Sequence, residues 1–267
     1  MTRVRPPAVA GMFYPGNADA LRRDVLAMLA AAETQPLTPK AIIVPHAGYI
    51  YSGPIAASAY TLLSPLRGRV SRVVLLGPVH RVWVPGLALP GADAFDTPLG
   101  RVEIDAKGVA AVAGLPQVET NPGAHAMEHS LEVHLPFLQV ALGDFKLVPL
   151  AVGGASPGEV AEVLDILWGG DETLIVVSSD LSHYLPYAQA RSVDAGTADA
   201  ILHLSTELIG ERACGAHPIN GLLLAARHKG LSAHLLDLRS SGDTAGDKHR
   251  VVGYGAFAFT EDNRHDA

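Results

Sequence analysis

The chain of 267 residues carries a formal net charge of −7, and 48% of its residues are hydrophobic. This hydrophobic content excludes an intrinsically disordered chain, and the length is sufficient to bury a sizeable core. The lysine and arginine residues form no basic tract, which excludes the clustered cations that bind nucleic-acid phosphates, so we expect no nucleic-acid partner.

The first part of the chain alternates predicted helices with apolar strands. Residues 17–32 are predicted to form a helix, because Asn17 suits the N-cap and leucine and valine recur at helical spacing. Buried strands are predicted at 40–46 and 71–80, each a continuous apolar run that ends beside a proline. The segment between them, 52–63, is predicted to be a helix.

Irregular elements are predicted in the middle of the chain. Residues 81–106 alternate short apolar stretches with turn residues, which predicts short strands or a hairpin with its turn at 97–100. A short helix is expected at 106–114. Residues 128–142 are predicted to be helical, with Pro136 marking a start, a kink or a break.

The remaining pattern defines the fold class. The later predicted strands are 145–153, 173–180, 231–241 and 250–260, with a helix at 157–168 and two or three helices across 187–230. Apolar strands that alternate with helices indicate an α/β fold. We therefore predict a single domain over residues 1–267 in three layers, with a mostly parallel central sheet and helices on both faces.

Polar residues able to bind a metal or move a proton follow three of the predicted strands. They are His46, His80, and the pair Asp180 and His183. Ligands bind at the carboxyl ends of parallel strands, where residues distant in sequence converge. One such histidine alone is more often structural, but the recurrence after three strands predicts a functional site.

A competing pattern lies at residues 125–129. The sequence HAMEH matches the H-x-x-E-H signature of a zinc peptidase, in which Glu128 would be the general base. That signature needs a helix through both histidines. Asn121, Pro122 and Gly123 come just before and favour a loop or a helix start at His125, so we disfavour a zinc hydrolase.

Longer motifs combine into a resemblance that covers nearly the whole chain. The motifs are PAVAGMFYPG (7–16), AIIVPHAGYIYSG (41–53), LLGPVH (75–80), EHSLEVHLPFLQ (128–139), VVSSDLSHY (176–184) and CGAHPI (214–219). Together they resemble the Memo (mediator of cell motility) family, which in bacteria is also called AmmeMemoRadiSam system protein B. That family is similar in structure to LigB-type class III extradiol dioxygenases, so the resemblance implies a LigB-like fold.

The resemblance also implies a metal site. LigB-type enzymes hold Fe(II) with two histidines and a carboxylate, and the matching positions are His46, His80 and Asp243. Animal members of the family have a cysteine where Asp243 aligns, and Asp237 and Asp247 are alternative third ligands. This set suits Fe(II), with zinc or copper as alternatives.

Further roles follow from the same resemblance. His129 and His183 are implied to be catalytic pocket histidines that take or deliver a proton. Residues expected beside the metal or around the substrate are Asp180, Tyr49, Tyr184 and Glu128. Asp180 either accepts a hydrogen bond from a ligand histidine or caps a turn. Cys214 is expected to be a small buried residue, with a reactive thiol as the alternative.

Two classes of function remain open at this stage. The first is a non-haem iron-dependent oxidoreductase or dioxygenase that acts on a small phenolic substrate. The second is a non-catalytic metal-binding or partner-binding protein, which includes an accessory to a radical-SAM enzyme. The single cysteine excludes an intrachain disulfide, and no apolar run reaches the roughly 20 residues of a membrane helix, so we expect a cytoplasmic protein without a membrane partner.

Overall fold

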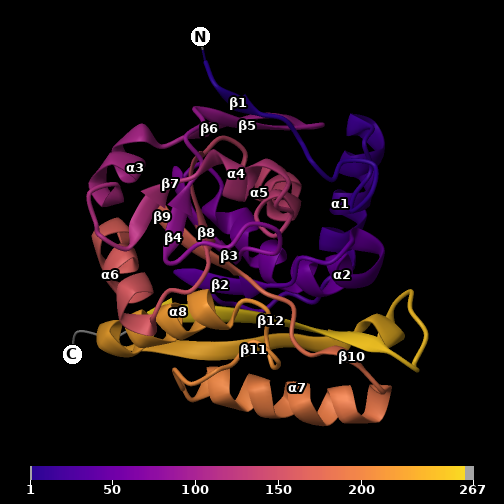
Figure 1. The fold of residues 1–267 in the computed structure, drawn as a ribbon. Helices are drawn as coiled ribbons and strands as arrows, with labels where there is room; N and C mark the ends of the chain where they lie inside the picture. Colours follow the sequence, from indigo (N-terminus) through magenta and orange to yellow (C-terminus); the bar gives the residue numbers. More distant parts are fainter. Residues whose placement is uncertain (1, 262–267) are drawn as a thin grey trace, which may run out of the picture.

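A mostly parallel β-sheet runs through the centre of the structure, a computed structural model that describes residues 2–261 (Figure 1). The middle strands are parallel and buried on both faces, as expected for continuous apolar runs that helices cover on both sides. In spatial order, these strands are β8 (Lys146–Val152), β3 (Arg72–Pro78), β9 (Thr173–Ser178) and β2 (Ala41–Val44).

Shorter or antiparallel strands extend the sheet on both sides. Beside β8 lie β6 (Gly100–Ile104), β5 (Ala94–Thr97) and β1 (Val4–Arg5), while β4 (Leu87–Leu89) pairs with β8 and with β7 (Val118–Thr120). On the other side, β2 pairs with the antiparallel strand β12 (Val251–Glu261), which also pairs with β10 (His183–Leu185) and β11 (Leu231–Ser240).

Helices cover both faces of the sheet, so the structure has three layers (Figure 1). One face packs against α1 (Ala18–Ala31), α2 (Tyr49–Tyr60), the 3-10 helix η1 (Thr61–Leu66) and α5 (Leu135–Leu142). The other packs against α3 (Ala106–Val112), α6 (Pro157–Leu167), α7 (Tyr187–Leu202) and α8 (Ala216–Lys229). Short helical turns complete the list: α4 (Pro122–Ala126), η2 (Glu132–His134) and η3 (Ser241–Asp243).

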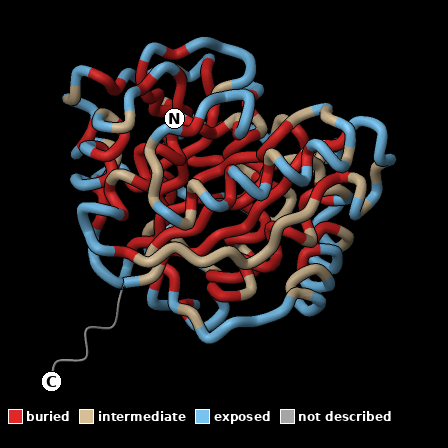
Figure 2. The backbone as a smooth tube through the Cα atoms, turned by 90° about the horizontal axis from the view of Figure 1, so that it is seen from below, coloured by how far each residue is buried: buried red, intermediate tan, exposed pale blue. Residues whose placement is uncertain are grey.

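The alternation of side chains along β2 shows how one strand serves two cores. Ile42 and Val44 belong to the apolar cluster with α1 and α2, whereas Ala41 and Ile43 belong to the cluster with α6 and α8. Successive residues of a strand point to opposite faces, so an unbroken apolar run fills both layers. Figure 2 shows the result, with buried strands in the middle and exposed residues on the outer surface of the helices.

The α/β fold class predicted from the sequence is confirmed. The helix predicted at 17–32 is α1, and the side chain of Asn17 caps it by accepting a hydrogen bond from the backbone N–H of Ala20. The hairpin predicted with its turn at 97–100 is formed by β5 and β6. The strands and helices predicted after residue 145 are also present, within a few residues at each end.

Two predicted helices begin elsewhere. The helix predicted at 128–142 was wrong in its first part, because residues 128–131 are not helical and α5 begins only at Leu135. Pro136 lies in the first turn of α5, where its missing N–H costs no hydrogen bond. The helix predicted from residue 52 begins earlier, at Tyr49. The strands β1, β7 and β10 were not predicted, because two or three residues carry no readable alternation.

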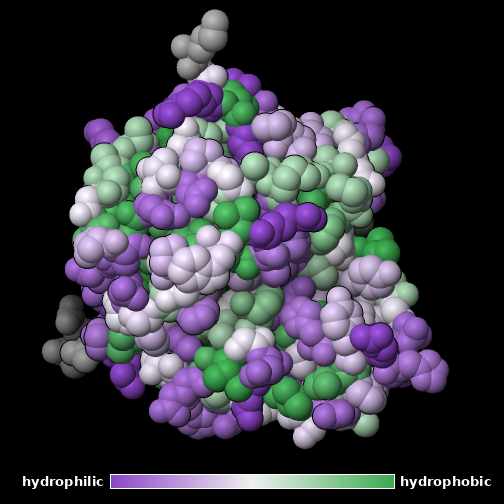
Figure 3. Space-filling view, viewed as in Figure 1, coloured by the Kyte–Doolittle hydropathy of each residue, from purple (hydrophilic) through white to green (hydrophobic). Residues whose placement is uncertain are grey.

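The surface is mixed in polarity. Figure 3 shows hydrophilic residues over much of one face, with smaller hydrophobic patches between them. Within residues 2–261, no helix combines the length and the apolar character needed to cross a membrane. Several exposed apolar side chains lie close in sequence to the predicted site residues, namely Ile50, Trp83 and Met127.

Candidate metal centre

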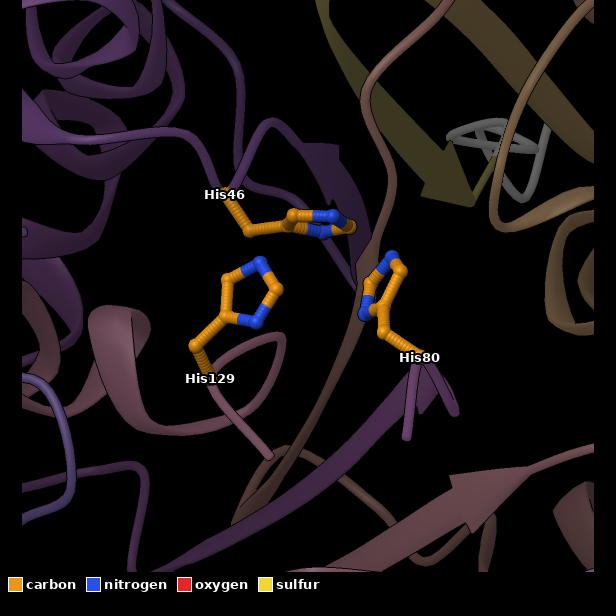
Figure 4. A group of neighbouring side chains, drawn as sticks. All are labelled: His46, His80 and His129. Atoms are coloured by element: carbon orange, nitrogen blue, oxygen red, sulfur yellow. The ribbon is translucent and has the colours of Figure 1, made fainter. Parts of the chain in front are cut away.

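Three histidines from separate segments face one another beyond the carboxyl ends of β2 and β3 (Figure 4). His46 and His80 each lie two residues beyond a strand, and His129 lies between α4 and η2. One nitrogen from each ring lies within 4.8 Å of the others. The ring centroids are 5.1 Å apart for His46 and His80, and 4.7 Å apart for His80 and His129. This convergence can hold one metal ion.

Glu128 fixes the orientation of two of these rings. Its Oε1 atom lies 2.8 Å from Nδ1 of His80 and 3.3 Å from Nδ1 of His129, and its Oε2 atom accepts the backbone N–H of His80 at 2.6 Å. Burial alone would raise the pKa of Glu128, but hydrogen bonds from His80 and Ser130 outweigh it and hold that pKa at about 2. The ionised carboxylate holds both Nδ1 atoms, which leaves both Nε2 atoms for a metal.

Ser178, at the end of β9, sets the tautomer of His46. The hydroxyl of Ser178 donates its single proton to the backbone carbonyl of Ser130 at 2.6 Å. It also lies 2.6 Å from Nδ1 of His46, and it can only accept there. Nδ1 of His46 therefore carries the proton, and Nε2 keeps a free lone pair. A neutral imidazole of this kind is a metal ligand.

Two of the rings are buried enough to stay neutral, and one side of the three-histidine group is open to solvent. Burial places the pKa of His46 well below its usual value and lowers the pKa of His129 to about 4. The side chain of His46 is 2% exposed, whereas those of His129 and His80 are 18% and 30% exposed. Solvent or a small molecule therefore reaches the centre from the side of His80 and His129.

Two further polar groups lie beside Nε2 of His46. The Sγ atom of Cys214 is 3.4 Å from this nitrogen, and Oδ2 of Asp180 is 3.9 Å from it. The other oxygen of Asp180 accepts the backbone N–H of His46 at 2.8 Å, so this carboxylate positions the loop rather than the ring. Burial raises the pKa of the Cys214 thiol to about 12, which keeps it protonated in the absence of a metal.

The aspartates predicted as third ligands lie apart from the three-histidine group. Asp243 belongs to η3, at the connection between β11 and β12, where its carboxylate accepts hydrogen bonds from Tyr187 and Ser240. Asp237 pairs with Arg239. Asp247 accepts the backbone N–H of a nearby residue. Among the described residues, the group assembled for a metal holds His129 in place of an aspartate.

The predicted pocket residues divide between the site and the core. His183, in β10, lies near enough to His80 for that residue's charge to affect its pKa, which burial lowers. Tyr184 is 61% exposed and adopts a positive φ of 59°. Tyr49 instead lies in the core, where its hydroxyl donates to the carbonyl of Val133 and its ring packs against Phe137.

The zinc-peptidase pattern does not form its helix. The helix α4 ends at Ala126, so His125 and His129 do not lie on one helical face. Nε2 of His125 is hydrogen-bonded to the backbone carbonyl of Ala88 at 2.7 Å and the residue is buried. His125 is therefore a core histidine. Glu128 contacts two of the three histidines of the candidate centre, His80 and His129.

Comparison with known proteins assigns the chain to a family. Residues 5–258 match the family model described as Memo-like protein. The chain belongs to the Memo-like family. MEMO1 family proteins of Ignicoccus hospitalis and Aquifex aeolicus are each 37% identical to it, over 96% of this chain and 98% and 99% of theirs. A MEMO1 family protein of Archaeoglobus fulgidus is 38% identical over 96% of this chain and 99% of its own.

A solved structure supports the fold of this Memo-like protein. The uncharacterized protein JW3007 from Escherichia coli K12 superimposes with a TM-score of 0.51 and 15% sequence identity, covering 80% of this chain and 98% of that one. At this identity the likeness concerns the fold alone.

A buried histidine beside the centre leads to a pH prediction. Burial lowers the pKa of His134 to about 3, whereas the unfolded chain takes up this proton near pH 6.5. Below pH 6.5 the unfolded state thus binds one more proton, and stability falls by about 1.4 kcal/mol per pH unit for this group until about pH 3. We expect His134→Gln to reduce the slope of unfolding free energy between pH 6 and pH 4 by that amount, as measured by urea denaturation.

The control for this prediction replaces an exposed histidine. His203 lies at the end of α7 with a side chain that is 75% exposed, and His203→Gln is expected to leave the slope unchanged. The slope is the diagnostic quantity, because the loss of the hydrogen bond between His134 and the hydroxyl of Tyr60 lowers stability at every pH. An unchanged slope in His134→Gln would contradict the assignment of a neutral buried imidazole.

Proposed function

We propose that this Memo-like protein is a metal-dependent oxidoreductase of the non-haem iron dioxygenase type, acting on a small phenolic substrate. The observation that carries the proposal is the group of His46, His80 and His129, in which one nitrogen from each ring lies within 4.8 Å of the others, while Ser178 and Glu128 hold Nδ1 of His46 and His80. Three neutral imidazoles suit iron, zinc or copper, and the partial exposure of two rings leaves room for further ligands.

Each residue of the site then has a defined task. Glu128 and Ser178 hold the rings in one tautomer, which prepares the ligand set before the metal arrives. A bound transition metal would polarise a phenol oxygen as a Lewis acid, and iron would add oxygen chemistry. His183, outside the three-histidine group, offers an imidazole that can take the proton from the substrate hydroxyl.

Oxygen consumption with a panel of catechols tests this proposal. We expect the protein, reconstituted with Fe(II) without air and then mixed with O₂, to consume oxygen in a catechol-dependent manner. His183→Ala should lower kcat by roughly 10²- to 10⁴-fold, since a positioned general base contributes that much, while the metal content is unchanged. His203→Ala is the matched control and should retain full activity.

A second candidate function also has an observation in its favour. The exposed apolar residues Ile50, Trp83 and Met127 each lie within four residues of a site histidine, which is typical of a surface that another protein covers. A metal-loaded protein that consumes no oxygen above the rate of free iron, over the whole panel, would favour a non-catalytic protein that binds a partner, such as a radical-SAM enzyme.

A further inference from the structure

A cavity of about 540 Å³ is lined in part by His183, one of the predicted site histidines. It lies between β10, the first half of α7 and the segment 209–212, and its apolar walls are Leu185, Val193 and Ile209. The volume is in the range of sites that bind small molecules. Ile209 is 54% exposed, so its apolar side chain is accessible to a ligand in the cavity.

His183 connects the cavity to the three histidines. His183 and Leu185 both belong to β10, and both line the cavity. His183 is also close enough to His46 and His80 to interact with their charges. His183 thus both lines the cavity and lies near two histidines of the candidate centre.

The strand that carries His183 is strained at this point. Tyr184 has a φ of 59°, and the pairing of β10 with β12 shifts its register between His183 and Leu185. A positive φ is costly for a tyrosine and is more often found at functional sites. The guanidinium of Arg250 lies 5.1 Å from the centroid of the Tyr184 ring, which is 61% exposed.

Arg212 gives the cavity a cation. Its side chain forms no hydrogen bond or ion pair with any other residue in the described range 2–261, although it lines the cavity. One guanidinium nitrogen would lie 3.8 Å from a Cβ atom at Gly196, so the group lies over α7. Glu211, the neighbouring residue, also lines the cavity and likewise has no described partner. A guanidinium presents paired donors that match a carboxylate.

A larger cavity elsewhere lacks this combination. It measures about 750 Å³ and opens at the amino ends of β3 and β8, the opposite end of these strands from the histidines. Two of its cations are already paired, because Arg72 contacts Asp105 at 2.6 Å and Lys146 lies 3.9 Å from Glu103. Only the smaller cavity joins an apolar wall, an unpaired arginine and a histidine of the candidate site.

We propose that the cavity beside His183 binds the non-reacting part of the substrate, an apolar body that ends in a carboxylate. The apolar body lies against Leu185, Val193 and Ile209, and the carboxylate pairs with Arg212. The reacting end of the molecule then lies at His183, facing the three histidines. This assignment rests on the proposed function, since it names the substrate class for the same site.

Binding to the metal-free protein tests the assignment separately from catalysis. The probes are 3-phenylpropanoate and its neutral amide, titrated by calorimetry against the full chain in the presence of a chelator. We expect the carboxylate to bind at least about 10-fold more tightly than the amide, because a charge-assisted pair is worth roughly 1.5–3 kcal/mol. Arg212→Gln should remove that preference, and Glu211→Gln, the matched control, should retain or strengthen it.

A second pair of variants tests the location of the apolar body. Val193→Trp fills the cavity and Ile209→Glu places a negative charge beside Arg212, and each should weaken the binding of 3-phenylpropanoate by more than 10-fold. Ile209 is exposed, so Ile209→Glu keeps the fold even if Val193→Trp disturbs α7.

The outcomes separate the two proposals. Absence of binding, equal affinity for the two probes, or a carboxylate preference that survives in Arg212→Gln overturns the assignment of the cavity. Binding with the expected pattern, together with a metal-loaded protein that consumes no oxygen, supports the cavity and rejects the proposed oxidoreductase.

Discussion

His80→Ala is expected to reduce bound metal from about one equivalent per chain to a level near zero, and His46→Ala and His129→Ala should do the same. The structure brings one nitrogen of each of the three rings together, and the loss of one ring leaves two ligands on an ion that needs at least three from the protein. Elemental analysis after reconstitution without air, in parallel with Fe(II), Zn(II) and Cu, measures the content and the identity of the metal.

Asp243→Ala discriminates between the two assignments of the third ligand. If His129 is the ligand, this variant should keep its metal, because Asp243 is held by Tyr187 and Ser240 in the described structure. Metal lost in Asp243→Ala but retained in His129→Ala would instead support the two-histidine-one-carboxylate set that the family resemblance implies. His125→Ala, at a core histidine outside the group, controls for nonspecific loss.

Glu128→Gln should have a smaller effect of the same kind. The amide keeps the shape of the side chain but has one acceptor oxygen, so it cannot accept from both the ring and the backbone N–H of His80, which use different oxygens of Glu128. Partners of ligand histidines typically contribute 10- to 100-fold to metal affinity, so we expect a Kd weaker by about that factor. An unchanged Kd would mean that packing alone orients the two rings.

The sequence allowed a good part of this site to be predicted. His46 and His80 each follow a strand of the same parallel sheet. Because these two strands lie close together in the sheet, the two histidines meet at its carboxyl edge. The alternation of apolar strands and helices predicted the layers for the same reason. These predictions succeed because the pattern of apolar residues along the chain indicates where each strand ends and that both faces of the sheet are covered.

His129 was harder to place from local pattern. It lies in an irregular segment, where helical spacing of apolar residues had predicted a helix from residue 128. Its position depends on contacts with Glu128 and with residues far away in sequence, which no periodicity reveals. Asp243 shows the converse problem, since a resemblance assigns it a ligand role, whereas in the structure its carboxylate accepts hydrogen bonds from Tyr187 of α7 and from Ser240.

The contact that holds this irregular segment is a buried ion pair. Glu132 is 0% exposed, and its carboxylate accepts four hydrogen bonds, from the guanidinium of Arg5 at 2.7 Å, the hydroxyl of Tyr14 at 2.5 Å, and the backbone N–H groups of Ala8 and Val9. The N-terminal arm is thereby fixed against the segment that carries His129.

Arg5 completes this connection. Its other guanidinium nitrogens donate to the backbone carbonyls of His125 at 2.7 Å and Glu128 at 2.6 Å. One buried arginine therefore binds both the carboxylate of Glu132 and the backbone on either side of Met127. Because the anchored carbonyl of Glu128 directly precedes His129, the ion pair also fixes the backbone that carries the third histidine.

Glu132→Ala is therefore expected to lower the free energy of unfolding by about 3–5 kcal/mol, because it leaves Arg5 buried without a counter-charge. The midpoint of thermal unfolding should fall by roughly 10 °C. Glu103→Ala is the matched control, since Glu103 forms an exposed pair with Lys146 and should change stability by less than about 1 kcal/mol.

The double variant Arg5→Met/Glu132→Leu separates the cost of an unpaired buried charge from the loss of the contacts that position His129. If the loss in Glu132→Ala comes from an isolated buried charge, removing both charges should recover a large part of the stability. The metal affinity should not recover, because the apolar pair cannot bind the carbonyls of His125 and Glu128 and so leaves His129 unanchored. A double variant with both full stability and full metal affinity would show that the arm stabilises the fold without positioning the site.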